Sequence, residues 1–130
     1  MTYEWRDHTA EIELVLRAPS PVEVFGEAVQ AFGRYVELDS GGDLVSRTVR
    51  VSGRDHATQL VALLEELIYL ADTERFVADD SVVQLKANDL RVELTGRVTA
   101  VQPIVKAATY HDLEFREVDG RWEARVILDV

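Results

Sequence analysis

The sequence predicts an α+β domain in which two helices pack on an antiparallel or mixed sheet that is built largely from hairpins. Three observations predict this class: two segments carry apolar residues at helical spacing, several others alternate between apolar and polar residues, and short turn signals separate them. A chain of 130 residues is long enough to bury a core without disulfides, so we expect a single domain that spans residues 1–130.

The N-terminal part predicts a strand and then a helix. Residues 12–16 have the composition of a strand, and residues 7–11 are expected to form a loop or a bend before it. Ser20 is expected to cap the first helix, with Pro21 at its first position and Glu23 completing a capping box. The buried stripe of this helix consists of residues at 3.6-residue spacing: Phe25, Ala28, Val29, Phe32 and Val36.

The second helix is predicted to be the central one. Residues 45–51 alternate as a strand before it, and Asp55 is expected to cap its N-terminus. Glu65, in the middle of this helix, is expected to be solvated. The apolar residues cover more than one face, which predicts neighbours on more than one side: Leu60, Val61, Leu63, Leu64, Leu67, Ile68, Leu70 and Ala71.

Residues 82–95 are predicted to form a hairpin. Asn88-Asp89 is a turn signal between two alternating segments, and a two-residue turn there would pair Leu85 with Val92. Gly96, directly after the hairpin, predicts a β-bulge or the end of strand pairing.

The C-terminal hairpin is the most fully specified element. Asp119-Gly120 is typical of a two-residue turn with positive φ at both centres. Continued toward the end of the chain, the register from this turn sets Tyr110 opposite Asp129 and places His111 opposite Leu128 as a core histidine. The register also gives one apolar face and one face of opposite charges: Leu113 with Val126, Phe115 with Ala124, Glu114 with Arg125 and Arg116 with Glu123.

The composition limits the classes of function. The net charge of −10 argues against a protein that binds nucleic-acid phosphates by itself, because such binding rests on Lys and Arg. An acidic surface suits hard cations or a basic protein partner, although acidity for solubility alone explains it equally well. The chain has no cysteine and no apolar run long enough to span a bilayer, so we expect no thiolate metal site, no membrane partner and a cytoplasmic location.

The candidate chemistry rests on carboxylates. No pair of histidines has zinc-ligand spacing, and no serine lies in a nucleophile-elbow motif. Glu11, Asp129 and the α-carboxylate of Val130 would meet if residues 7–11 lie against the last strand. Oxygen ligands alone favour a hard divalent cation, Ca²⁺ or Mg²⁺, and nothing indicates an organic cofactor. An Asx-type turn is an alternative use of the Asp7 carboxylate.

Four segments together resemble the archease family, and they cover the chain from near residue 3 to residue 130. They read Asp7-His8-Thr9-Ala10-Glu11, Leu64-Glu65-Glu66-Leu67-Ile68-Tyr69-Leu70 with Asp72-Thr73-Glu74, Lys106-Ala107-Ala108-Thr109-Tyr110-His111-Asp112-Leu113, and Arg125-Val126-Ile127-Leu128-Asp129-Val130. The resemblance implies an archease-like sandwich. It departs from the family where Glu11 replaces the usual aspartate; glutamate keeps the charge and can still reach a cation.

The resemblance also implies a function. Archeases are small acidic proteins that activate the GTP-dependent RNA ligase of the RtcB class, which joins tRNA halves and other RNAs and guanylylates one of its own histidines in a metal-dependent step. It therefore implies an accessory protein, not the ligase itself, that meets tRNA only through the ligase. The family's metal-binding positions correspond to Glu11, Asp129 and the main chain of Val130. Lys106 matches its functional lysine, and Asp7 and His8 are further candidates for partner binding.

Two other classes of function stay open. A metal-dependent hydrolase would use Glu11 and Asp129 to hold the cation, with His8 or His111 as the base. A general chaperone or protein-binding module would instead expose an apolar patch and suppress the aggregation of unrelated proteins.

Overall fold

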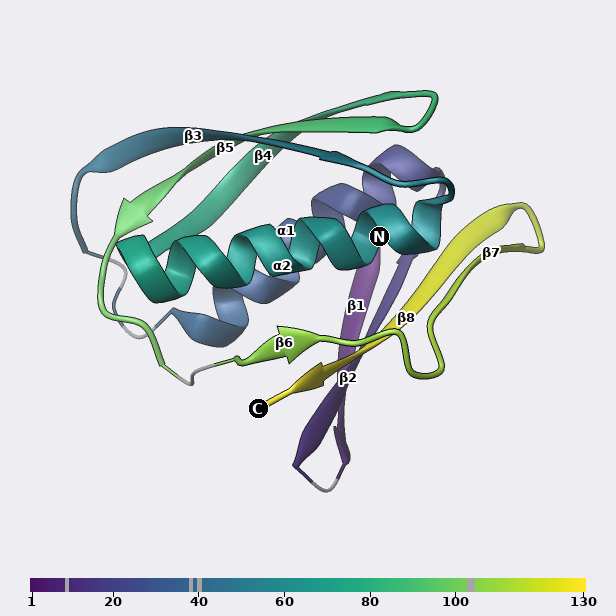
Figure 1. Ribbon diagram of the computed structural model, residues 1–130, viewed down its shortest axis with the longest axis horizontal. Helices are drawn as coiled ribbons and strands as arrows, with labels where there is room; N and C mark the ends of the chain where they lie inside the picture. Colours follow the sequence, from purple (N-terminus) through teal and green to yellow (C-terminus); the bar gives the residue numbers. More distant parts are fainter. Residues whose placement is uncertain (9, 38, 40, 103–104) are drawn as a thin grey trace.

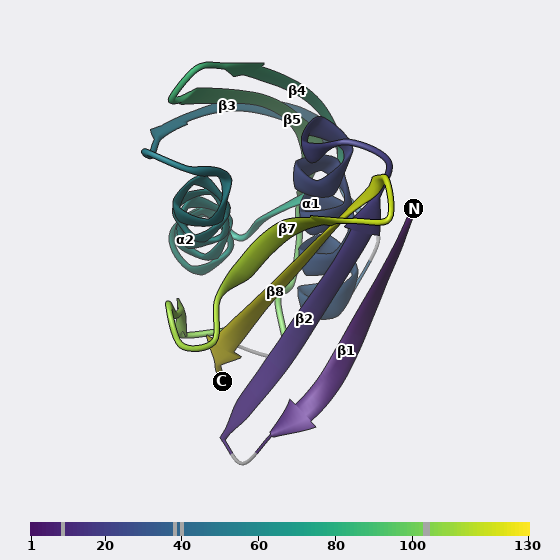
Figure 2. The same cartoon turned by 90° about the vertical axis from the view of Figure 1, so that its right-hand side faces the viewer.

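Two helices lie between two antiparallel sheets in the computed structural model of the chain (Figure 1). The structure describes residues 1–8, 10–37, 39, 41–102 and 105–130, and for Asp7 and His8 it describes the backbone alone. The predicted class, two helices on antiparallel strands joined as hairpins, is confirmed. The strands are divided between two sheets, one on each side of the helices (Figure 2).

In chain order, the hairpin β1–β2 precedes the first helix, the single strand β3 lies between the helices, and the hairpins β4–β5 and β7–β8 follow the second helix. The larger sheet has the strand order β1-β2-β8-β6, with β7 also paired to β8, and the smaller sheet has the order β3-β5-β4. Both helices contact strands of both sheets, so the core fills the space on either side of the helical layer. Within the described residues the elements are β1 (Thr2–His8), β2 (Glu11–Ala18), α1 (Pro21–Val36), β3 (Leu44–Ser52), α2 (His56–Glu74), β4 (Phe76–Lys86), β5 (Asp89–Val98), β6 (Ala107–Ala108), β7 (Glu114–Val118) and β8 (Arg121–Asp129).

Both helices begin at the predicted caps. The Ser20 hydroxyl oxygen accepts a hydrogen bond from the Glu23 backbone N–H at 3.3 Å, and the hydroxyl donates to the Glu23 carboxylate at 3.1 Å. The Asp55 carboxylate accepts from the Thr58 backbone N–H at 2.7 Å. This hydrogen bond stabilises the charged form and lowers the pKa of Asp55 below its ordinary value.

The predicted central position of α2 is also confirmed. Its apolar residues are buried over most of its circumference, because β3 and β4 cover it on one side and β6 and β7 on the other. The predicted stripe of α1 is buried as well. No helix in the described part of the chain is long and apolar enough to cross a membrane.

The turn between β4 and β5 lies one residue earlier than predicted. Lys86 pairs with Asp89, so the turn is Ala87-Asn88, and Leu85 faces Leu90 instead of Val92. The reason is the third strand: β3 pairs with β5 as far as Asp89, which draws that residue into the sheet. The pairing is shifted by two residues, and a shift of two keeps every side chain on its predicted face.

Gly96 is predicted to mark a bulge, and the structure contains one there. The register between β4 and β5 shifts between Ala78 and Asp80, opposite Gly96. The Gln30 side-chain amide of α1 donates to the Asp79 carbonyl oxygen at 2.7 Å, which satisfies a backbone group in the bulge. The bulge therefore joins the smaller sheet to α1.

Replacing Gly96 by alanine tests this close approach. The added Cβ would lie 2.0 Å from the carbonyl oxygen of Val77, so β4 must shift, and we expect a loss of about 1–3 kcal/mol in the free energy of unfolding. Gly26→Ala is the matched control, since the nearest atom to its Cβ is the Ser81 hydroxyl oxygen at 3.9 Å, and alanine favours the helix by about 0.5–1 kcal/mol. Urea unfolding measures both variants. Equal stability of the two would contradict the close contact.

Candidate functional site

The N-terminal hairpin positions Glu11 at one end of the larger sheet. β1 extends to His8, β2 begins at Glu11, and these two residues are paired. The expected loop over residues 7–11 is therefore wrong for Asp7, His8 and Glu11, which belong to strands. Ala10 has a φ of 57° and lies in the connection between the strands, and Thr9 lies outside the described residues. The side chains of Asp7 and His8 also lie outside the described part, so their predicted roles stay predictions.

The last strand brings Asp129 to the same place. All of β2 pairs with β8, and Glu11 is directly opposite Asp129. Directly opposite residues of an antiparallel pair share a face and have Cβ atoms about 4.5–5.5 Å apart. The Val130 backbone N–H lies 3.5 Å from the Ala10 carbonyl oxygen, which keeps the last residue beside the hairpin. We call Glu11, Asp129 and Val130 the tip.

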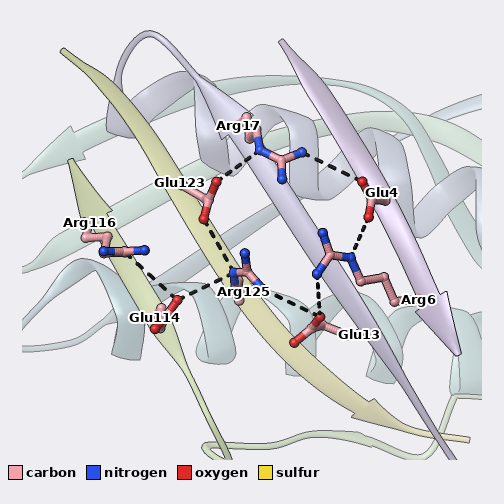
Figure 3. Close-up of polar contacts among 8 residues, drawn as sticks. All are labelled: Glu4, Arg6, Glu13, Arg17, Glu114, Arg116, Glu123 and Arg125. Atoms are coloured by element: carbon pink, nitrogen blue, oxygen red, sulfur yellow. Dashed lines mark hydrogen bonds and ion pairs between the residues drawn. The ribbon is translucent and has the colours of Figure 1, made fainter. Parts of the chain in front are cut away.

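The face of the sheet next to the tip is covered by alternating Arg and Glu side chains (Figure 3). Arg17 lies 3.0 Å from the Glu123 carboxylate, and Arg125 lies 3.4 Å from the same carboxylate. Each member of this ion-pair network has an opposite charge within 4.0 Å. The members come from β1, β2, β7 and β8: Glu4, Arg6, Glu13, Arg17, Glu114, Arg116, Glu123 and Arg125.

The network lowers the pKa of two of its carboxylates, Glu4 and Glu123. Burial raises the pKa of Glu123, but hydrogen bonds from Arg17 and Arg125 outweigh this effect and hold the pKa below its ordinary value. A hydrogen bond from Arg6 likewise lowers the pKa of Glu4. Glu4 and Glu123 therefore stay ionised at neutral pH. The network contains equal numbers of Arg and Glu side chains, so the face is locally close to neutral.

On β2 the ion-pair network includes Glu13 but not Glu11, the next residue along the same face and a member of the tip. Alternate residues of β2 are buried toward the helices, beginning with Ile12, so Glu11 and Glu13 lie on the same outer face. Glu13 is an ion-paired member of the network. In the part of the chain that the structure describes, neither Glu11 nor Asp129 has a cationic side chain within 4.0 Å. Among the residues whose side chains the structure describes, the carboxylates of Glu11 and Asp129 therefore have no cationic partner.

The tip supplies few side-chain ligands. Among the described residues, no group of three or more His, Cys, Asp or Glu side chains is placed to hold a metal ion. The side-chain oxygens at the tip are those of Glu11 and Asp129, so a further ligand would be an oxygen of Val130. This all-oxygen donor set suits a hard cation.

Lys106 lies beside the tip. Its backbone N–H donates to the Asp129 carbonyl oxygen at 2.9 Å, and Ala107 pairs with Asp129 on the side away from Glu11. Val105 before it is buried, whereas Lys106 itself is exposed. The segment is therefore anchored through its backbone and Val105, while the Lys106 side chain is exposed.

The predicted register is correct for the hairpin and wrong beyond it. Asp119 and Gly120 form the turn with φ of 52° and 79°, and every predicted pair from Glu114 onward is present. Asp129 pairs with Ala107, however, and not with Tyr110, which is exposed. A turn between Tyr110 and Leu113, closed by a 3.3 Å hydrogen bond, takes up the intervening residues. His111 consequently lies on the surface, 3.3 Å from the Asp112 carboxylate, and is not a core histidine.

Glu65 is a residue of this region that the sequence did not identify. Its carboxylate accepts a hydrogen bond from the Ala108 backbone N–H at 3.0 Å, so it is not merely solvated. β6 pairs with β8 along one edge only, so the Ala108 N–H has no acceptor on β8, and the Glu65 carboxylate accepts its hydrogen bond. This contact ties α2 to the segment that carries Lys106. No local signal predicts it, because it depends on how the helix lies against the sheet.

Comparison with known proteins identifies the family. The model of the Archease protein family (MTH1598/TM1083) matches residues 3–130. The chain belongs to the archease family. The resemblance inferred from the four motifs is thereby confirmed. The archease of Archaeoglobus fulgidus is 32% identical over 141 residues and aligns over 100% of both chains. That of Pyrococcus furiosus is 30% identical over 139 residues and aligns over 98% of both.

Solved archease-like structures have the same fold. The solution structure of protein 1598 from Methanobacterium thermoautotrophicum superimposes with a TM-score of 0.76 at 27% identity and covers 98% of both chains. The crystal structure of an archease from Thermotoga maritima, described as a possible chaperone, gives a TM-score of 0.69 at 17% identity over 100% of this chain and 98% of that one. The second likeness shows the fold alone.

The uncompensated charge at the tip predicts opposite effects of two neutralising variants. Asp129→Asn removes a repulsion, so in metal-free buffer we expect it to raise the free energy of unfolding by about 0.2–1 kcal/mol. Glu13→Gln is the matched control, because it removes the partner of Arg6 and Arg125 and is expected to lower stability by a similar amount. Chemical denaturation in the presence of a chelator measures both. A loss of stability in Asp129→Asn would show that the tip carboxylates are compensated.

Proposed function

We propose that this archease-family chain activates a GTP-dependent RNA ligase of the RtcB class and thereby serves tRNA splicing and RNA repair. It acts as an accessory protein and leaves the joining reaction to the ligase. The observation that carries the proposal is the tip, where the carboxylates of Glu11 and Asp129, which have no cationic partner among the described side chains, lie beside an exposed lysine. The partner that such a tip fits is an active site that handles metal ions and nucleotide phosphates.

The shape of the molecule supports insertion of the tip into a recess. The β1–β2 hairpin extends past the helices, and the C-terminus lies beside it (Figure 2). Glu11 and Asp129 lie at this projecting end of the ladder. The ion-pair network behind them neutralises the sheet face, so a partner meets charge mainly at the end of the projection (Figure 3).

The tip is proposed to hold a divalent cation, Ca²⁺ or Mg²⁺. Glu11 and Asp129 would supply carboxylate oxygens and Val130 a terminal or main-chain oxygen, a donor set that fits hard cations. The cation would supply positive charge that stabilises phosphate oxygens. Glu11 is longer than the aspartate usual in the family and keeps the same charge.

The chain's own residues have two roles in this proposal. Lys106 presents an ammonium group beside the tip and orients a phosphate of the nucleotide during guanylyl transfer. Binding of the whole tip can equally favour the productive conformation of the ligase, which requires only that the tip binds this conformation more tightly. Glu65 holds β6, and hence Lys106, in place for either role.

A chaperone-like role is the second candidate. The Thermotoga maritima archease is described as a possible chaperone. Two large side chains near the Lys106 segment and on α2 are exposed here, Tyr110 by 65% and Tyr69 by 58%. Suppression of the aggregation of unrelated proteins would favour this role over ligase activation.

Extending the C-terminus tests the cation site. An added peptide converts the Val130 carboxylate to a neutral amide and crowds the tip, so we expect weaker Ca²⁺ or Mg²⁺ binding with little change in thermal stability. Isothermal titration calorimetry compares this variant with a protein extended by the same peptide at Met1, which lies away from the tip (Figure 2). Equal cation affinity in the two would argue against ligation by the terminus.

Stimulation of a cognate ligase tests the proposed function. With GTP, metal and RNA supplied, the native chain is expected to accelerate guanylylation and multiple-turnover joining. Asp129→Ala and Lys106→Ala should each reduce this acceleration by about tenfold or more, since each removes a charged contact. Arg121→Gln, at the far end of β8, is the control and should retain it. Absence of acceleration by the native chain, or full acceleration by Asp129→Ala, would overturn the mechanism.

A further inference from the structure

A second unusual arrangement of charge lies on the outer face of the smaller sheet. Arg50 of β3 is directly opposite Arg91 of β5. Directly opposite residues have Cβ atoms about 4.5–5.5 Å apart, and like charges in such positions are destabilising. In the ion-pair network of the larger sheet, by contrast, the directly opposite residues Arg17 and Glu123 have opposite charges (Figure 3).

The two arginines are poorly compensated. Arg91 has one carboxylate partner, Glu93 on its own strand at 3.2 Å, and in the described part of the chain Arg50 has none within 4.0 Å. The Nε of Arg91 is buried and has no hydrogen-bond partner among the described residues. By contrast, the Nε of Arg47 donates to Glu74 at 2.8 Å and that of Arg97 to Asp79 at 3.2 Å.

An unpaired buried guanidinium N–H is unfavourable, so the present position of the Arg91 side chain forgoes a hydrogen bond. An acceptor that binds both guanidinium groups would restore this bond and also relieve the repulsion between Arg50 and Arg91. The acceptor must be an anion, because only negative charge offsets both effects.

The surrounding residues form a place for such an anion. A hollow of about 470 Å³ is lined by residues of all three strands. Its polar residues are Arg50, Ser52, Gln84, Lys86, Asp89 and Arg91, and its apolar residues are Val51 and Leu90. Gln84 is directly opposite Arg91 on β4, so the two arginines and this amide form one row across the sheet. Lys86 adds a third cation, and Asp89 is the carboxylate in the lining.

We propose that this hollow binds a phosphate group, supplied by the backbone of single-stranded RNA or by free phosphate. Arginine presents a planar fork of N–H donors that matches phosphate oxygens, and Gln84 and Ser52 add neutral donors. The smaller sheet lies on the opposite side of the helices from the larger one, so the site is separate from the tip (Figure 1). The overall charge of −10 repels a polyanion, which keeps the binding weak and local.

The test is a titration of the isotopically labelled full chain, followed by NMR, with a short single-stranded RNA and separately with inorganic phosphate at the same phosphate concentration. RNA is expected to shift the amide signals of Arg50, Gln84, Lys86 and Arg91. For two phosphate contacts, a fourfold increase in salt should weaken binding about sevenfold. If the shifts are larger with RNA than with inorganic phosphate, the ligand is the RNA backbone. If the shifts are equal, the ligand is a free phosphate ion.

The double variant Arg50→Gln/Arg91→Gln should lose these shifts, and its melting temperature should not fall, because a repulsion has been removed. Arg34→Gln/Arg121→Gln changes the net charge equally at exposed positions elsewhere and should retain them. Lys86→Gln, a milder change in the same hollow, should weaken binding and provides a second variant. Absence of shifts at low salt, or equal losses in the two double variants, would overturn the proposal.

Discussion

The pairing of β2 with β8 is the constraint on which the rest of the structure depends. These strands come from opposite ends of the chain, and their register sets Glu11 opposite Asp129 at the end of the ladder. β8 holds β6 and β7 along its other edge, so the segment with Lys106 and the last hairpin both take their positions from it. A single pairing thus closes the core on one side of the helices and also builds the tip.

Ion pairing determines which carboxylates on the surface are left without a positively charged neighbour. A chain with a net charge of −10 has carboxylates to spare, yet the outer face of the larger sheet is close to neutral because its Arg and Glu side chains alternate (Figure 3). Exposed ion pairs contribute only about 0–1 kcal/mol each to stability. Their more important effect here is spatial, since they pair the charges of the sheet face and leave the carboxylates of Glu11 and Asp129 outside the network.

Local signals predicted most elements, because a cap or a tight turn depends on neighbours within a few residues. The cap at Asp55 and the turn at Asp119-Gly120 are of this kind. Predictions were wrong where a third element intervenes: β3 draws Asp89 into the sheet, and the turn after Tyr110 interrupts the register. The proximity of the two chain ends was a conditional inference from spacing. The contact of Glu65 with β6 was out of reach, since it depends on tertiary packing.

β6, which lies beside the tip, and β7, which forms the last hairpin, are paired separately with β8. β6 and β7 occupy the same edge of β8 in registers that differ by three residues, and the turn between Tyr110 and Leu113 takes up the difference. β6 and β7 are each held by their own pairing with β8, so a change in the length of that turn leaves both registers in place. A longer loop grafted there would carry a label or a recognition peptide to within a few residues of Lys106, while the spacing of the carboxylates stays as it is.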